Sequence, residues 1–301
     1  MQSIYSLSEL FPAVTVHSLE QGDGFSERSP MEVHDSQTPI RYPHRLISEI
    51  SHPELLEFQP ERSNGHAILI IPGGGYQIVS IDNEGVEVAK CLSEMGYHAF
   101  CLNYRLPIKN DGSDLEQLTP IVDARAALTL IRQLVPMARV GIMGFSAGGH
   151  LAGWLSTDTL SNRPDFTCLM YPVVSMTSGV THLGSYENVV NALNDAQQIS
   201  LLSIDERISP DVAPMLIMHA KDDDVVVVEH SLKLHNALLA ASVSSELTLF
   251  ERGGHGFGVY VREGSDADDW LRRFDDWVRN LDYCQQWSTR AMAQTNVIST
   301  K

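Results

Sequence analysis

The stretch Val140-Gly-Ile-Met-Gly-Phe-Ser-Ala-Gly-Gly-His-Leu-Ala152 decides the fold class of this 301-residue chain. The apolar run 140–143 has the pattern of a buried strand, and Gly144-Phe-Ser-Ala-Gly148 after it fits G-x-S-x-G. A helical pattern follows, so the serine falls on a sharp strand-to-helix turn that lifts its hydroxyl above the sheet edge. The helix N-terminus beneath it favours developing negative charge. This context predicts Ser146 as a nucleophile, whereas a bare five-residue match would be a glycine-rich turn with an incidental serine.

The same alternation of apolar runs and helical patterns extends in both directions from this stretch. Strands that alternate with helices of about 10–15 residues imply right-handed βαβ units and a mainly parallel sheet. We therefore expect an α/β fold with a central sheet flanked by helices. The expected strands are 67–71, 98–102, 139–143, 166–170, 215–219 and 247–250, and the expected helices are 84–95, 120–134, 147–155, 229–241 and 266–281.

These patterns also suggest how the chain is divided. We expect the catalytic domain over residues 66–282, preceded by an N-terminal extension, 1–65, whose first strands pack on the core. Residues 1 to 45 of that extension are polar and look irregular. The segment 175–211 interrupts the alternation and is expected to lie over the strand ends as a small cap, and 283–301 is expected to be a C-terminal tail.

Composition and charge exclude several classes of partner. The chain has 43% hydrophobic residues, a formal net charge of −17 and a pI near 5.0. Binding to nucleic acid or to anionic lipid needs a basic patch, so neither partner is expected. No run approaches the roughly 18 apolar residues of a membrane span. A small neutral substrate fits this charge best, and the sequence leaves a homo-oligomer open.

The N-terminus and the cysteines indicate the compartment. Residues 1–10 lack the basic and apolar regions of a secretory signal, so we expect a cytoplasmic protein. The cysteines show no CxxC pair and no metal-ligand spacing, which predicts reduced thiols, no metal and no organic cofactor. They are Cys91, Cys101, Cys168 and Cys284.

A serine hydroxyl needs a positioned base, and the chain has 12 histidines from which to choose it. His255 lies in a glycine-rich loop directly after the last expected strand, and loops at strand C-termini converge on the ligand crevice of an open α/β sheet. His150, one turn into the helix after Ser146, is expected to point away from the hydroxyl. His219 ends an apolar strand, where a satisfied core histidine is expected.

Three consecutive carboxylates, Asp222, Asp223 and Asp224, follow another strand end and supply the acid that orients the base. Three adjacent buried carboxylates would repel one another, so at least one is expected to face solvent or to cap a turn. Spacing alone leaves the choice among the three open.

Pro72-Gly-Gly-Gly-Tyr76 follows the expected strand 67–71. An acyl-transfer enzyme needs preorganised N–H donors for the oxyanion, and glycines let main-chain amides turn inward. Gly74 and Gly75, with the amide of Ala147, are the candidates. A phosphate-binding loop is disfavoured because neither G-x-x-x-x-G-K-[ST] nor G-x-G-x-x-G is present.

Taken together, these motifs resemble the bacterial acetyl esterase branch of the α/β-hydrolases, related to acetyl-xylan esterases and feruloyl-esterase-like proteins. The resemblance covers roughly residues 65 to 280. The motifs that carry it are PGGGY (72–76), NYRLP (103–107), DAR (123–125), GFSAGGHLA (144–152), RPDF (163–166), YPV (171–173), THLGS (181–185), HAKDDDVV (219–226) and ERGGHGFG (251–258).

The resemblance implies an α/β-hydrolase fold and selects Asp223 as the acid, four residues after the histidine that ends its strand. Serine, acid and base then follow the order expected for this fold. The chain departs from the family in having Val227 where proline is often found, which loosens a turn but removes no catalytic group. The implied substrates are small acyl esters, chiefly acetylated sugars. Without a secretion signal, imported xylo-oligosaccharides are expected rather than polymeric xylan.

The sequence therefore predicts a serine ester hydrolase with the triad Ser146, Asp223 and His255. The alternatives are an amide hydrolase on the same triad, of the aminoacyl-peptidase or formamidase type, and a non-catalytic binding protein. The lack of an N-terminal propeller-like repeat region disfavours the peptidase, and the complete set of catalytic groups disfavours the binding protein. Tyr76, Tyr104 and His182 are candidate substrate-binding residues, although core packing is the commoner fate of such tyrosines.

Overall fold

A computed structural model of the chain describes residues 2–19, 29–35, 44–109, 114–159, 162–177, 179–193 and 196–283. The chain forms two compact units, Met1–Ala267 and Asp268–Lys301. The described part of the second unit contains a helix over 270–283, where the sequence predicted one over 266–281. Apart from Tyr283, the predicted C-terminal tail lies outside the described residues.

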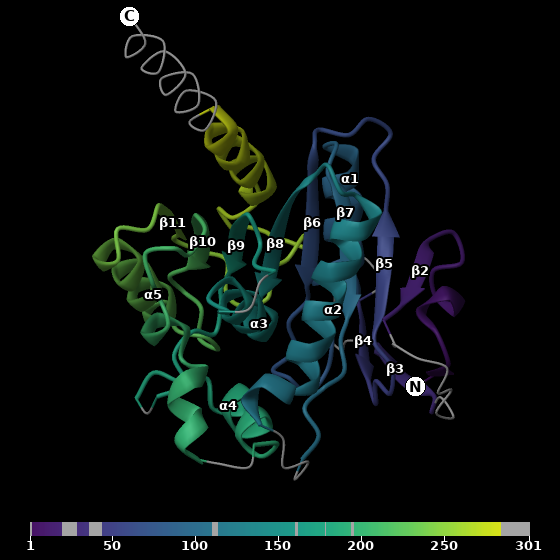
Figure 1. Cartoon of the computed structure of the whole chain (residues 1–301), viewed down its shortest axis with the longest axis horizontal. Helices are drawn as coiled ribbons and strands as arrows, with labels where there is room; N and C mark the ends of the chain where they lie inside the picture. The colour runs from purple at the N-terminus through teal and green to yellow at the C-terminus, as the bar shows by residue number, and fades with distance from the viewer. Residues whose placement is uncertain are drawn as a thin grey trace, which may run out of the picture. The chain divides into compact units, whose positions relative to one another are not determined.

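The first unit is built on an eight-stranded sheet with the strand order β11-β10-β9-β8-β6-β7-β5-β2 (Figure 1). The six strands from β11 to β7 run parallel, while β5 and β2 at one edge pair antiparallel. This confirms the predicted α/β fold with a mainly parallel sheet. The strands are β2 (Thr15–Ser18), β5 (Glu54–Phe58), β6 (His66–Ile71), β7 (His98–Asn103), β8 (Arg139–Phe145), β9 (Phe166–Met170), β10 (Met215–Ala220) and β11 (Ser245–Phe250).

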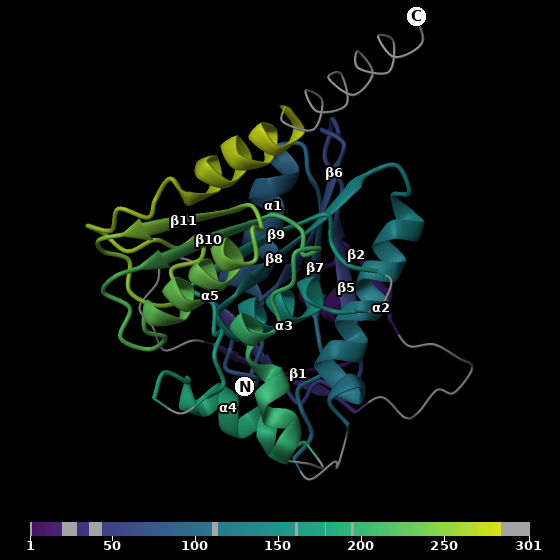
Figure 2. The same cartoon turned by 60° about the vertical axis from the view of Figure 1, so that its left-hand side comes forward.

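Helices cover both faces of this sheet, which is why its central strands are apolar throughout. Every residue of β6 and of β10 is buried. In both views α2, α3 and α5 lie on one face and α1 on the other (Figures 1 and 2). These helices are α1 (Glu87–Glu94), α2 (Thr119–Leu134), α3 (Ser146–Ser156) and α5 (Glu229–Ala240).

The N-terminal extension is more regular than the sequence predicted. Strands β1 (Gln2–Ile4), β3 (Met31–Asp35) and β4 (Arg45–Ser48) form a three-stranded antiparallel sheet, so the expectation of an irregular segment over residues 1 to 45 was wrong. The strands are short and only one face is buried, which leaves a weak hydrophobic signal. Ile47 of β4 also pairs with Val79, which ties this small sheet to the loop that follows β6.

The segment predicted as a cap contains no strand among its described residues. It holds α4 (Leu183–Val190) and two short 3-10 helices, η4 (Ala196–Leu202) and η5 (Ile204–Glu206). The side chain of Asn188 on α4 donates a hydrogen bond of 2.9 Å to the carbonyl oxygen of Gly75. Helix α4 therefore lies against the loop after β6, and its function as a cap stays a prediction.

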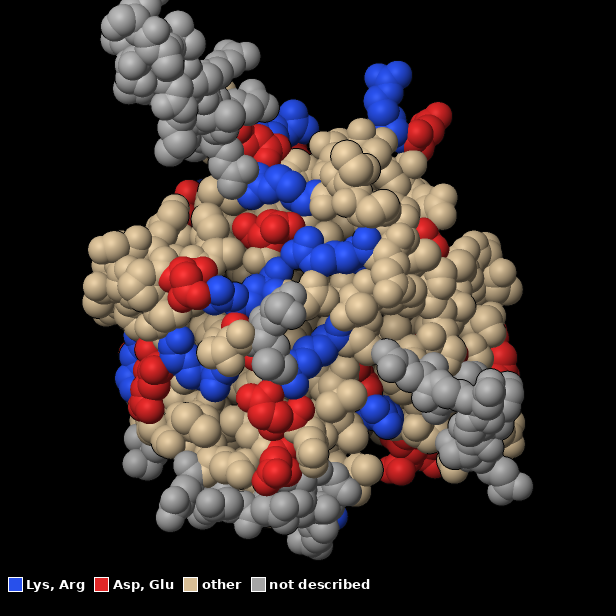
Figure 3. Space-filling view, in the orientation of Figure 1, with Lys and Arg blue, Asp and Glu red and all other residues tan. Residues whose placement is uncertain are grey.

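Charged side chains are interspersed on the surface that Figure 3 shows, where Lys and Arg lie beside Asp and Glu. Several of the ion pairs join segments distant in sequence: Arg125 with Asp158 at 2.8 Å, Arg132 with Asp165 at 3.4 Å and Arg163 with Asp211 at 2.6 Å. None of the helices in the described ranges has the length and apolar character that crossing a bilayer requires.

Candidate active site

The turn between β8 and α3 holds Ser146 in a conformation that few side chains adopt. Ser146 is the first residue of α3, and its φ of +51° lies in the left-handed region. Two glycines allow the close packing around it. A Cβ on Gly144 would lie 2.3 Å from the carbonyl oxygen of Gly148, and one on Gly148 would lie 2.2 Å from that of Ile71. The G-x-S-x-G motif therefore forms the strained turn that the sequence context predicted.

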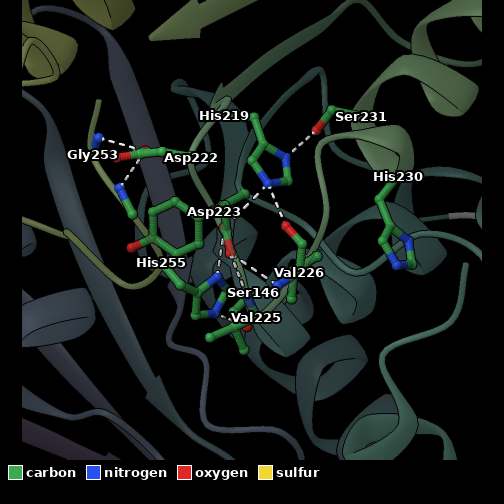
Figure 4. Close-up of polar contacts among 12 residues, drawn as sticks. Ser146, His219, Asp222, Asp223, Val225, Val226, His230, Ser231, Gly253 and His255 are labelled. Carbon is green, nitrogen blue, oxygen red and sulfur yellow. Dashed lines mark hydrogen bonds and ion pairs between the residues drawn. The ribbon is translucent and has the colours of Figure 1, made fainter. Parts of the chain in front are cut away.

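Three side chains predicted as a triad meet at the ends of three strands (Figure 4). The Nε2 atom of His255 lies 2.9 Å from Ser146 Oγ, and its Nδ1 atom lies 2.7 Å from Asp223 Oδ2. Because the carboxylate accepts a hydrogen bond from Nδ1–H, the Nε2 atom carries no proton and can accept a hydrogen bond from the serine hydroxyl. The structure thus brings together the nucleophile, base and acid expected from the sequence. Their catalytic roles stay a prediction.

Asp223 is held by four hydrogen-bond donors. Its Oδ1 atom accepts from the amides of Val225 at 3.0 Å and Val226 at 2.9 Å, and its Oδ2 atom lies 3.2 Å from His219 Nε2 as well as close to His255. Burial would raise the pKa of this carboxyl, but the hydrogen bonds from the two histidines and the nearby charge of His255 hold it well below its usual value. Asp223 is therefore an ionised acceptor over the whole neutral range.

His219 is a buried histidine with every polar atom paired, as the sequence suggested. Its Nε2 atom faces two acceptors, Asp223 and the carbonyl oxygen of Val226 at 2.8 Å, so it carries the proton. Its Nδ1 atom accepts from the Ser231 hydroxyl at 2.7 Å. His219 also orients the acid of the triad, a role that the sequence did not suggest.

The three consecutive aspartates have three different surroundings. Asp222 Oδ1 accepts from the amides of Gly253 and Gly254, both at 2.8 Å, and so anchors the loop 251–258 that carries His255. Asp224 is exposed. One carboxylate thus faces the base, one caps a turn and one faces solvent, which avoids the repulsion expected of three buried neighbours.

The loop Pro72–Tyr76, here called the oxyanion loop, follows β6 beside Ser146. The amide of Gly73 donates to Glu84 Oε2 at 2.9 Å and is not available to a substrate. Gly74 and Gly75 have φ values of +131° and +64°. Within the described part of the chain, the amides of Gly74, Gly75 and Ala147 donate no hydrogen bond. Their role as oxyanion donors stays a prediction.

Of the three candidate substrate-binding residues, Tyr76 ends the oxyanion loop and Tyr104 packs against it. The Tyr76 hydroxyl lies 2.8 Å from His150 Nδ1, and the Tyr104 hydroxyl donates to the carbonyl oxygen of Pro72 at 3.0 Å. Burial lowers the pKa of His150 to about 4, so its neutral ring accepts from Tyr76 and donates through Nε2 to the carbonyl oxygen of Leu202 at 2.7 Å. Both tyrosines therefore brace the loop, and a direct substrate contact by either stays a prediction.

The third candidate, His182, belongs to the predicted cap and faces the oxyanion loop. Its Nδ1 atom accepts from the amide of Ser185 at 3.3 Å and so caps α4. Its Cε1 atom lies 4.0 Å from the position that a Cβ on Gly75 would take. Burial, and then the nearby charge of His255, lower its pKa. His182 thus both holds α4 and faces the loop, and a contact with substrate stays a prediction.

The three cysteines in the described part of the chain make none of the contacts described for this site. Cys101 and Cys168 are fully buried free thiols, as expected for small core residues, and Cys91 is also free. Cys284 lies outside the described residues. Nor do the described His, Cys, Asp and Glu side chains form a group of three or more arranged to hold a metal ion.

Sequence reasoning missed two residues beside the triad, Asn83 and Glu84. Both belong to η2 (Asp82–Val86), a single π-helical turn that precedes α1. In the sequence they look like the polar first turn of an ordinary amphipathic helix, where acidic residues are common. No local pattern distinguishes them, and only the contacts described below reveal their position.

The sequence profile of the prolyl oligopeptidase family matches residues 114–282, which is more than half of the chain and includes all three triad residues. The chain belongs to this family of α/β-hydrolases. The family match starts after the oxyanion loop and ends near the end of the last described helix. It therefore covers the elbow, the aspartates and the histidine loop, but not the N-terminal sheet.

Two curated proteins resemble this member of the family. An acetylxylan esterase of Xylanibacter ruminicola is 31% identical over 245 residues, which are 78% of this chain and 50% of that protein. Endo-1,4-beta-xylanase B of Butyrivibrio fibrisolvens is 30% identical over 209 residues, 64% of this chain and 32% of that protein. The chain thus spans half or less of the length of the curated relatives it matches.

Solved structures share the fold over nearly the whole chain. An acetyl ester-xyloside bifunctional hydrolase from Caldicellulosiruptor lactoaceticus superposes with a TM-score of 0.71 at 27% identity, covering 89% of this chain and 97% of that one. A sugar hydrolase from Lactococcus lactis gives 0.65 at 25% identity, covering 84% and 98%. These matches confirm the α/β-hydrolase fold that the sequence motifs predicted.

Proposed function

We propose that the chain is a serine carboxylic ester hydrolase that removes acetyl or other short acyl groups through Ser146, Asp223 and His255. One observation carries the proposal. The serine hydroxyl, the imidazole and the buried carboxylate form a continuous chain of hydrogen bonds of 2.9 and 2.7 Å. This chain starts at the sharp turn between β8 and α3, which has the form of a nucleophile elbow.

The geometry supports the following acylation step. Ser146 Oγ attacks the acyl carbon while its proton moves to His255 Nε2, and Asp223 stabilises the imidazolium that forms. The negative charge that develops on the acyl oxygen is met by main-chain amides, for which Ala147 and the glycines of the oxyanion loop are the candidates. Collapse of the tetrahedral intermediate breaks the ester bond, and His255 gives the proton to the departing alcohol.

Deacylation reverses these proton movements. Water takes the place of the alcohol, His255 Nε2 removes its proton, and the resulting hydroxide attacks the acyl carbon of the acyl-enzyme. The carboxylic acid leaves and Ser146 regains its proton from His255. Every step uses groups of this chain alone, and the proposal includes no metal or organic cofactor.

Acetylated xylo-oligosaccharides are the substrate class that we propose. The acetylxylan esterase of Xylanibacter ruminicola and the acetyl ester-xyloside hydrolase of Caldicellulosiruptor lactoaceticus both combine an acetyl ester with a xylan or xyloside in their names. A cavity of about 580 Å³ next to the oxyanion loop supports a sugar as the leaving alcohol. Its lining includes Tyr76 of the loop and Gln77 directly after it, Asn188 of α4, and Glu32 of β3 with Glu49 directly after β4. Polar side chains of this kind suit hydroxyl groups.

The first test is hydrolysis of p-nitrophenyl acetate by the wild type, by Ser146→Ala and by the matched control Ser93→Ala on α1. We expect Ser146→Ala to lose roughly 10⁴–10⁶-fold in kcat and Ser93→Ala to keep wild-type rates. Equal rates for the wild type and Ser146→Ala would overturn the proposal.

The family match favours one second candidate, since the family takes its name from peptidases. Amide hydrolysis would use the same triad on an aminoacyl-peptide or a formyl amide. A panel of acetylated xylo-oligosaccharides, p-nitrophenyl esters of increasing acyl length, aminoacyl amides and formyl amides separates the two. A higher kcat/KM for the amides than for the acetyl esters would replace the esterase by an amidase.

A further inference from the structure

A second carboxylate, Glu84, lies beside the proposed triad with its side chain buried. It belongs to the π-helical turn η2 and is 4% exposed. Its Oε2 atom accepts the amide proton of Gly73 in the oxyanion loop at 2.9 Å. A Cβ on Gly73 would lie 2.8 Å from this oxygen and 2.9 Å from Ser146 Cβ, so Gly73 alone separates the carboxylate from the nucleophile.

The other oxygen of Glu84 reaches the opposite side of the site through Tyr171, which directly follows β9. The Tyr171 hydroxyl accepts the amide proton of Gly258 at 3.0 Å and donates its own proton to Glu84 Oε1 at 2.9 Å. The tyrosine ring stands edge-on to the ring of His255, with centroids 5.0 Å apart. Glu84 therefore connects the oxyanion loop to the loop that carries the base.

The preceding residue, Asn83, reinforces this connection. Its Nδ2 atom donates to the carbonyl oxygen of Gly256 at 2.9 Å, and its Oδ1 atom accepts from the amides of Val259 at 3.1 Å and Tyr260 at 2.9 Å. Two consecutive side chains of one π-helical turn thus hold both loops of the site. Single π-helical turns of this kind occur frequently at functional sites.

Burying a carboxylate costs free energy, and a well-packed apolar residue would avoid that cost. Glu84 has no Lys or Arg partner among the contacts of the described residues. Burial raises its pKa, while the nearby charge of His255 opposes the rise. The other titratable groups that face it are Tyr171 and Tyr104, and burial raises the pKa of both phenols. The group that gains most from a negative Glu84 is therefore the imidazolium of His255.

We propose that Glu84 is a positioning residue that fixes the oxyanion loop relative to His255 and, as a carboxylate, stabilises the protonated base during the reaction. The inference rests on the proposed triad. Glu84 itself touches no reacting atom, because it acts through Gly73 on one side and through Tyr171 on the other.

The sign of the expected pH effect follows from the charge. A negative group near an imidazole favours the protonated ring, and a neutral group in its place removes that stabilisation. The acidic limb of the kcat/KM profile, which reports the free base, then moves to lower pH. Loosening of the two loops lowers kcat, whereas KM changes little because the proposed sugar-binding cavity does not contain Glu84.

The experiment compares Glu84→Gln with Glu54→Gln on full-length protein, using p-nitrophenyl acetate across the pH range. Glu54 is the matched control, since it is also a buried carboxylate with two hydrogen-bond donors, Ser6 Oγ at 2.7 Å and the amide of Leu7 at 2.8 Å. With active sites counted by fluorophosphonate labelling, we expect Glu84→Gln to lower kcat about 10–100-fold and to shift the acidic limb downward. Glu84→Asp should restore the limb, and Glu54→Gln should change neither quantity.

Three results would overturn the inference while the proposed function stands, that is, while the wild type is active and Ser146→Ala is not. The first is a kcat per labelled site in Glu84→Gln that equals the wild-type value. The second is an acidic limb in Glu84→Gln at the wild-type pH. The third is a loss of kcat in Glu54→Gln as large as that in Glu84→Gln. If Glu84→Gln does not fold, Tyr171→Phe replaces it, because this variant removes only the bridging hydroxyl. We then expect a fall in kcat of about tenfold with KM unchanged, and wild-type kcat would overturn the inference.

Discussion

The nucleophile and the base of this site are held in place by different means. At the elbow between β8 and α3, backbone packing fixes Ser146: its φ is +51°, and Gly148 lies so close to β6 that a Cβ would approach Ile71 O to 2.2 Å. In the loops after β10 and β11, hydrogen bonds that backbone amides donate to side-chain carboxylates hold the residues in place. Asp222 accepts from two amides of the histidine loop, and Asp223 accepts from two amides of its own loop.

This difference predicts how each region responds to substitution. Tightly packed backbone atoms cannot move apart to accept an added side chain, so a change at the elbow disturbs folding together with activity. A hydrogen bond from a loop amide to a carboxylate can be removed while the fold remains, so a change there acts on catalysis first. The proposed roles of Asp222, Asp223 and Glu84 can therefore be tested separately from stability.

Among the residues of the loops after β10 and β11, the largest effect on activity is expected for Asp223→Asn. The amide cannot accept the His255 proton in the same way and favours the wrong imidazole tautomer, so kcat should fall roughly 10⁴-fold with the fold intact. Steady-state kinetics on p-nitrophenyl acetate, with circular dichroism as the check on folding, measure this. The control is Asp224→Asn, the exposed neighbour, which should stay within about twofold of the wild type. A comparable loss in both variants would contradict the assignment of the acid.

The largest effect on stability is expected for Gly148→Ala. The new methyl group meets the carbonyl oxygens of Ile71 and Pro72 at 2.2 and 2.3 Å, and neither backbone atom can move away. We expect the free energy of unfolding in urea to fall by roughly 3 kcal/mol or more. In Gly153→Ala, on the same helix, the three atoms nearest to the methyl group all belong to the side chain of Ile204, with Cδ1 nearest at 2.7 Å and Cγ2 at 3.3 Å, so the loss should stay within about 1 kcal/mol. Similar stabilities for the two variants would count against backbone packing as the cause.

An intermediate effect is expected for Asp222→Ala. The variant leaves the triad in place but removes the acceptor for the amides of Gly253 and Gly254, so His255 is less well positioned. We expect kcat to fall about tenfold, KM to change little and the free energy of unfolding to fall by about 1 kcal/mol. Kinetics and urea unfolding on the same preparation measure both. If Asp222→Ala loses much stability and keeps its kcat, these loops respond to substitution as the elbow was expected to, and the comparison between the two regions is wrong.

A pH-dependent loss of stability is expected from two buried histidines, His150 on α3 and His230 on α5. Burial lowers the pKa of each from 6.5 to about 4. As the pH falls below 6.5, the unfolded chain binds protons that the folded chain does not, so stability is complete above that pH and declines toward pH 4. Each histidine contributes up to about 1.4 kcal/mol per pH unit. Urea unfolding at about pH 7.5 and about pH 5 measures the slope.

The control for this slope is a pair of substitutions on α5. His230→Gln removes one of the titrating groups and should reduce the pH dependence. His235→Ala removes a half-exposed histidine of the same helix and should leave it unchanged. If the wild type has the same free energy of unfolding at both pH values, the two histidines do not make its stability depend on pH.

The parallel core was predictable because a strand with both faces covered must be apolar along its whole length. Strand β9 was predicted with its observed bounds, 166–170, and the ends of β10 and α5 differ from the prediction by a single residue. The N-terminal strands were harder to recognise. Each is short and only partly buried, so the alternation that marks a half-buried strand extends over too few positions.

The sequence predicted the parts of the site in which the backbone needs glycine. It did not predict the parts in which side chains from distant segments form hydrogen bonds with one another. The glycines around Ser146 and His255 are visible in the sequence because only glycine fits those positions. The choice among three adjacent aspartates depended on family resemblance, since their local surroundings in the sequence are the same. Glu84 could not be found at all, because its partners Gly73 and Tyr171 lie 11 and 87 positions away.

The link between Asn83 and Gly256 has a consequence for folding kinetics. These residues lie 173 positions apart, while Ser146 and His255 lie 109 apart. Contacts of such high sequence separation close large loops and raise the contact order, which slows folding. A refolding chain should therefore regain its helical circular dichroism before the proposed esterase activity. Turnover would then report the last tertiary contacts to form.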